Sequence, residues 1–84
     1  MKLFLISQDI NNDYDTFDSA VVAAEDENDA RHIHPGRYEN TQKWWEGYCD
    51  KLYASWVLPE DVKVEYLGET DRSRGVICAS YNAG

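Results

Sequence analysis

The sequence has little cysteine, little positive charge and no long hydrophobic run. Its two cysteines, Cys49 and Cys78, are too few for a disulfide scaffold, and no third cysteine provides metal-ligand spacing. We therefore expect buried free thiols in a reducing compartment. The apolar run near the start, residues 3–6, is too short for a signal peptide or a membrane span. These features predict a cytoplasmic protein that does not enter a membrane.

Recognisable catalytic motifs are also missing. The chain contains no glycine-rich phosphate loop, no nucleophile elbow and no zinc motif. Cys49 falls on the apolar face of a predicted helix and Cys78 within a predicted strand, whereas a reactive thiolate needs electropositive, partly exposed surroundings. We predict that the protein is not an enzyme, has no catalytic residue and needs no cofactor.

Basic residues are scarce, above all in the first third of the chain. Eight Lys and Arg stand against sixteen Asp and Glu, which gives a net charge of −8. Residues 1–29 contain eight of the acids and one base, Lys2, so this third carries −7. Such a field repels nucleic-acid phosphates and anionic lipids, and it favours a basic partner surface or serves solubility. We do not expect direct DNA binding.

Apolar and aromatic residues are abundant enough for a folded core. Hydrophobic residues make up 43% of the chain, with three Trp and six Tyr. Disordered chains lack the apolar mass that offsets the entropy cost of ordering. At 84 residues, the chain predicts one small domain over residues 1–84 with a single core.

The hydrophobic patterns predict four strands and two helices. The strands are expected at residues 2–8, 19–24, 62–69 and 76–84. In the third, Val62, Val64 and Tyr66 alternate with Lys63 and Glu65, as in a strand with one dry and one wet face. The loop at residues 70–75 has hairpin length.

The first helix is expected to begin at Asp26, a favourable N-cap with Asp29 three positions on, and to stop at Pro35. A second helix is expected at about residues 41–56 from apolar side chains at three- and four-residue spacing. The order ββααββ predicts an α+β fold of two layers, with an antiparallel sheet of about four strands and both helices on one face.

Oxygen-bearing side chains alternate at residues 9–15, as they do in a calcium loop. That pattern requires glycine at its sixth position and a bidentate glutamate at its twelfth, and these positions hold Tyr14 and Ala20. His32 and His34 lie two apart, so on a helix they point away from each other and do not share a metal. We predict no metal site. Turn-forming side chains in a solvated loop explain the composition at residues 9–15.

Two kinds of binding site stay open. The lead hypothesis is an acidic surface that binds a basic protein through the loop at residues 9–18 and the helix start, together with an exposed tryptophan. Its residues are Asp9, Asp13, Asp15, Asp18, Glu25, Asp26 and Trp44. The alternative is a protein that sequesters a nucleotide or small anion at a subunit interface of a homo-oligomer. Its residues are Arg31, His34, Arg37, Tyr38 and Trp44.

Three stretches, YDTFDSAVVAAEDENDARHIHPG, WVLPEDVKVEYLGE and RGVICASYNAG, together resemble small proteins encoded by phages and prophages, mostly of unknown function. These stretches cover a little over half of the chain and carry no defined chemistry. The resemblance implies a phage origin and hence action in the cytoplasm of the host cell. It is compatible with a counter-defence factor that occupies a host protein and with a trap for nucleotide signals.

Overall fold

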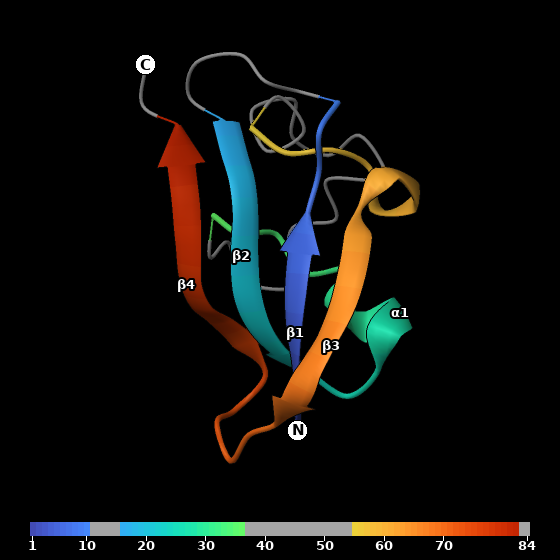
Figure 1. Cartoon of the computed structure of the whole chain (residues 1–84), viewed down its shortest axis with the longest axis vertical. Coiled ribbons are helices and arrows are strands. Elements are labelled where there is room, and N and C mark those ends of the chain that lie inside the picture. The colour runs from blue at the N-terminus through green and yellow to red at the C-terminus, as the bar shows by residue number, and fades with distance from the viewer. Residues whose placement is uncertain (11–15, 37–54, 83–84) are drawn as a thin grey trace.

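A four-stranded antiparallel sheet is the main feature of the protein. The computed structural model describes residues 1–10, 16–36 and 55–82. In these residues the strands are β1 (Lys2–Ser7), β2 (Thr16–Ala24), β3 (Lys63–Glu69) and β4 (Gly75–Asn82). Their spatial order is β3-β1-β2-β4, so β1 and β2 are central (Figure 1). The hairpin expected across residues 70–75 does not form, because β3 and β4 lie at opposite edges of the sheet.

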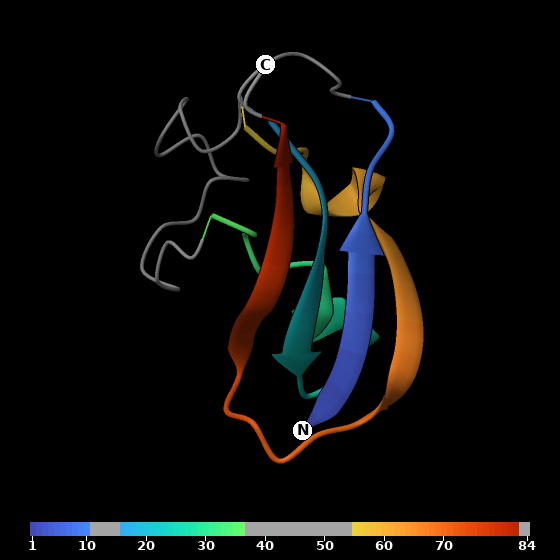
Figure 2. The same ribbon diagram turned by 60° about the vertical axis from the view of Figure 1, so that its left-hand side comes forward.

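One face of this sheet carries the core. The helix α1 (Glu27–Ala30) and the 3-10 turn η2 (Pro59–Asp61) lie on the same side of the strands (Figure 2). Phe4 and Ile6 of β1 pack there with residues of β2 and with buried side chains around α1 and η2. The remaining buried members are Ala20, Val22, Ala24, Ala30, Ile33, Trp56, Val57 and Val62. Burial of this apolar surface stabilises the domain.

The prediction of an α+β fold with two helices on one face of the sheet is wrong. The described residues contain one α-helix of four residues and one 3-10 turn, so the fold is mostly β. The second predicted helix lies mainly outside the described residues, and its last two residues, Ser55 and Trp56, are not helical.

The first helix begins as predicted but ends early. Asp26 is the N-cap, and its side chain accepts a hydrogen bond from the backbone N–H of Asp29. After Ala30 the chain makes one tighter turn, in which Ile33 N donates to Ala30 O, and then runs into the core. Ile33, His34 and Pro35 are all buried. Burial of these three residues therefore replaces the one further helical turn that was expected before Pro35.

The strands at residues 2–8, 62–69 and 76–84 occur within two residues of the predicted bounds, whereas β2 begins three residues early. Thr16 is 1% exposed, and Phe17 N donates to Ser55 O at 2.9 Å. Pairing with Tyr81 and Asn82 of β4, with a register shift after Phe17, extends the strand into a sequence that favours turns.

Cys78 in β4 is a free thiol and is exposed, so the prediction of a buried thiol is wrong at this position. Cys49 lies outside the described residues.

Two glycines occupy backbone conformations that other residues rarely adopt. Gly68 has φ +146° and Gly75 has φ +147°, and a Cβ atom added to either would have no heavy atom within 4 Å. Gly75→Ala is therefore expected to cost about 1–3 kcal/mol through backbone strain alone. Urea unfolding measures this loss, with Ser80→Ala in the same strand as the control, expected to change stability by less than about 0.5 kcal/mol. Equal stability of Gly75→Ala and wild type would contradict the strain.

Candidate functional site

The start of α1 is a compact arrangement of acidic side chains. Asp26 Oδ1 accepts from Asp29 N at 2.7 Å, and Asp29 Oδ2 accepts from Glu25 N at 3.0 Å. The first bond satisfies a backbone N–H group that the helix leaves without an intrahelical partner, and the second holds the residue before the N-cap. Asp26 is exposed while Asp29 is half-buried, so the two carboxylates have different surroundings.

Asp29 also joins α1 to the start of β4. Arg74 Nε donates to both carboxylate oxygens of Asp29, at 2.8 and 2.9 Å, and Arg74 Nη2 lies 2.8 Å from Asp29 Oδ1. The two side chains are 24% and 23% exposed. A forked, partly shielded contact of this kind is stronger than a surface ion pair. An arginine from the C-terminal half of the chain thus neutralises one of the N-terminal carboxylates.

Arg31 connects α1 to η2. Its Nη1 donates to Val62 O at 2.9 Å and to Pro59 O at 3.3 Å, and its Nη2 lies 3.7 Å from Glu27 Oε1. The guanidinium therefore binds protein oxygens on both sides. Arg31 was a candidate for anion binding, and the structure instead uses it to hold η2 against α1.

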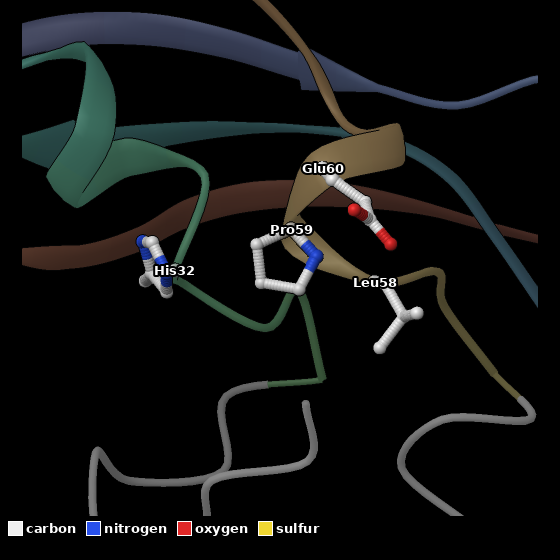
Figure 3. Close-up of a pocket in the computed structure, with 4 residues that line it drawn as sticks. All are labelled: His32, Leu58, Pro59 and Glu60. Atoms are coloured by element: carbon white, nitrogen blue, oxygen red, sulfur yellow. The ribbon is translucent and has the colours of Figure 1, made fainter. Parts of the chain in front are cut away.

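An open pocket lies beside this junction (Figure 3). His32, Leu58, Pro59 and Glu60 line a volume of about 280 Å³. His32 Nδ1 lies 2.7 Å from Asn28 O. Since a carbonyl oxygen only accepts, this nitrogen carries the proton and the ring is held at the end of α1. The pocket walls thus combine an imidazole, two apolar side chains and one carboxylate.

His34, the second described member of the predicted anion site, is 3% exposed. Its Nδ1 accepts from Gly36 N at 2.9 Å, its Nε2 lies 3.4 Å from Ser55 Oγ, and its ring meets Phe17 edge-to-face with centroids 6.1 Å apart. His34 packs against β2, while Arg31 binds η2. The structure therefore gives these two residues separate protein partners.

The predicted acidic surface is divided between the two ends of the sheet. Asp18 lies near the start of β2, next to the end of β1, where Gln8 N donates to Asp18 O. Asp9 follows Gln8 at the same end. Glu25 and Asp26 follow the other end of β2. At about 3.3 Å per residue, the seven residue steps from Asp18 to Glu25 separate the two groups by about 20 Å.

Asp9 has a partner in β3. Lys63 Nζ donates to Asp9 Oδ2 at 2.7 Å, and both side chains are exposed. This hydrogen bond, with the attraction of the ammonium, holds the pKa of Asp9 below its ordinary value. The pair therefore favours the folded state at neutral pH, and this contribution is lost as the pH falls through the lowered pKa of Asp9.

Lys63→Met is expected to raise the pKa of Asp9 towards its ordinary value, because the variant removes both the donor and the positive charge. Carboxyl-carbon NMR titration measures this pKa directly. Lys2→Met removes the same charge at the opposite end of β1 and is the control, with Asp9 expected to titrate as in wild type. A pKa for Asp9 that Lys63→Met leaves unchanged would contradict the assigned pair.

Five of the predicted site residues lie outside the described part of the chain. These residues are Asp13, Asp15, Arg37, Tyr38 and Trp44. Their proposed roles stay predictions.

Most carboxylates in the described residues form no ion pair with a lysine or arginine of the same residues. These residues contain eleven acidic and five basic side chains, hence a formal charge of −6. Three of the bases pair with Asp9, Glu27 and Asp29. The other eight carboxylates form no ion pair with a base of the described segments, and seven of them are exposed. These seven are Asp18, Glu25, Asp26, Glu60, Glu65, Glu69 and Asp71.

The pocket residues were not predicted as a site. Residues 58–61, LPED, fall between the predicted second helix and the third strand, although proline at the first helical position followed by two acids is typical of a helical turn. That signal would have predicted η2, but the approach of His32 depends on the fold.

The described residues hold neither a metal-ligating cluster nor a helix that could span a membrane. Within residues 1–10, 16–36 and 55–82, no group of three His, Cys, Asp or Glu side chains is arranged to hold a metal ion. No helix in the same ranges is long and apolar enough to cross a membrane. No protein-family model matches the chain, and comparison with curated proteins and with solved structures finds no significant match.

Proposed function

We propose that this chain is a non-enzymatic binding protein that occupies a host protein with a basic surface, as a counter-defence factor of phage type acting in the host cytoplasm. The observation that supports the proposal is the set of seven exposed carboxylates without a described basic partner. Their combined field attracts a basic surface and repels acidic ones.

We assign the contact with the partner protein to three acidic residues at the start of α1, Glu25, Asp26 and Glu27. We call them the helix-end acids, because they lie at the end of the sheet where α1 begins. These three side chains are consecutive and exposed, and the Asp29–Arg74 contact fixes the short helix beneath them. The acids at the other end of the sheet lie about 20 Å away, whereas charges in solution are screened over about 8 Å at physiological salt. The acids at each end of the sheet therefore attract a partner independently. A single basic surface can bind by contacting the helix-end acids alone.

Capture of a partner from a bacterial lysate tests this proposal with two matched variants. The helix-end variant combines Glu25→Gln, Asp26→Ser and Glu27→Gln, in which serine keeps the N-cap acceptor. The control combines Asp9→Asn, Asp18→Asn and Glu65→Gln, which removes three charges from the opposite end and the middle of the sheet. We expect the helix-end variant to bind the captured protein at least tenfold more weakly than the control. Equal binding by both variants would remove the helix end from the proposal.

A further inference from the structure

The open pocket between His32 and η2 has a size and lining that suit one side chain. Its volume of about 280 Å³ lies just below the range of about 300–1,000 Å³ for small-molecule pockets. Leu58 and Pro59 form an apolar wall, and the carboxylate of Glu60 lies beside them (Figure 3). An apolar wall next to a single charge matches a ligand with an alkyl stem and a charged end.

The charge around the pocket favours a cation. Glu60 is exposed, Asp61 follows it in η2, and Glu27 is linked to the same turn through Arg31. Arg31 is the base at this junction, and its guanidinium already binds Pro59 O, Val62 O and Glu27. A phosphate placed in the pocket would meet the carboxylate of Glu60, and no lysine or arginine lines the wall, where the protonated Nδ1 of His32 is already bound to Asn28 O. The lining therefore disfavours a nucleotide.

We propose that this pocket binds the cationic end of an arginine or lysine side chain, with the alkyl stem on Leu58 and Pro59 and the charged group beside Glu60. This inference rests on the proposed function for the source of the side chain, which is a basic segment of the bound protein. The pocket adds selection by shape to the attraction of the helix-end acids, because an extended cationic side chain can contact the apolar wall and the carboxylate at once.

Titration of the labelled protein by amide NMR with the peptide acetyl-Gly-Arg-Gly-amide tests the proposal. We expect saturable shifts centred on the amides of His32, Leu58 and Glu60. The same peptide with citrulline, which has the shape of arginine without its charge, is expected to bind at least tenfold more weakly. Glu60→Gln is expected to weaken arginine-peptide binding about two- to fivefold, the range for one exposed ion pair. Glu65→Gln is the control and is expected to bind as wild type.

Three results would overturn the pocket assignment. These are equal shifts with the citrulline peptide, unchanged affinity in Glu60→Gln, and shifts that lie away from η2. Agmatine, a small molecule with a guanidinium on an alkyl chain, distinguishes a free small-molecule ligand from an arginine side chain of a protein. Binding of agmatine at least tenfold more tightly than the arginine peptide would overturn the assignment to a protein side chain.

The pocket and the helix-end surface can fail separately. If Glu60→Gln leaves partner capture intact while the helix-end variant loses it, the pocket assignment is overturned and the proposed function stands. If the helix-end variant captures as well as its control while the arginine peptide binds at η2, the helix-end surface is overturned instead.

Discussion

His34→Ala is expected to lower the free energy of unfolding by about 2–4 kcal/mol. The substitution leaves the backbone N–H of Gly36, which is half-buried, without its acceptor, and the loss of such a partner costs about 1–3 kcal/mol. It also removes the edge-to-face contact with Phe17, worth about 0.5–1.5 kcal/mol. For a domain whose total stability is about 5–15 kcal/mol, this loss is large. Urea unfolding measures the difference.

His34→Asn is the matched variant. The side-chain oxygen of asparagine can accept from Gly36 N near the place of Nδ1, while the ring contact with Phe17 is lost. We expect a cost of about 1–2 kcal/mol, roughly half that of alanine. If asparagine costs as much as alanine, the hydrogen bond is not the reason for the loss. If neither variant changes stability, the structural role of His34 is wrong and its place in an anion site regains weight.

Asp29→Ala is expected to destabilise the protein by about 2–3 kcal/mol. It removes the bidentate contact with Arg74 and the acceptor for Glu25 N, and hydrogen bonds to charged groups contribute about 1.5–3 kcal/mol. Both side chains are less than one quarter exposed, so solvent screens the contact less than it screens a surface pair.

A double-mutant cycle isolates the contribution of the Asp29–Arg74 contact. Asp29→Ala and Arg74→Met together are expected to show a coupling free energy of about 1–2 kcal/mol. Arg72→Met removes a nearby exposed arginine and is expected to change stability by less than about 0.5 kcal/mol. Additive effects of Asp29→Ala and Arg74→Met would show that α1 does not depend on this pair.

Local sequence patterns predicted the strands and the start of the helix. The alternation of apolar and charged residues correctly predicted the third strand, in which Lys63 and Glu65 are exposed, while Val62 just before it is buried. Tyr66 is 56% exposed, although its ring still meets Phe4 edge-to-face with centroids 5.8 Å apart. Asp26 could be predicted as the N-cap because capping depends on residues three positions apart.

Features that depend on distant residues could not be predicted. The helix ends at Ala30 because the next residues enter a core formed by strands from both halves of the chain. Strand order has no local signal, so the edge positions of β3 and β4 were missed. The turn-rich composition around residues 16–18 also led to a predicted start of β2 that was three residues too late. Pairing of Thr16 and Phe17 with β4 outweighs the local preference for a turn.

The candidate site shows the same limit. Arg31 was predicted to bind an anion, but it donates to Val62 O, 31 residues away in sequence, and the contact of Arg74 with Asp29 spans 45 residues. The acidic residues were predicted as one surface because they are close in sequence. A strand of nine residues separates them into two groups. Charge totals can be counted from a sequence, whereas the distribution of that charge over a surface requires the fold.

The dependence of partner affinity on salt tests most directly whether the acidic helix end selects the partner. Between about 0.1 M and 1 M salt the screening length falls from about 10 Å to about 3 Å. We predict that the dissociation constant of the wild-type complex rises at least tenfold over this range. The variant carrying Glu25→Gln, Asp26→Ser and Glu27→Gln should bind weakly throughout, with a clearly smaller salt dependence. A wild-type affinity that does not change with salt would contradict the account.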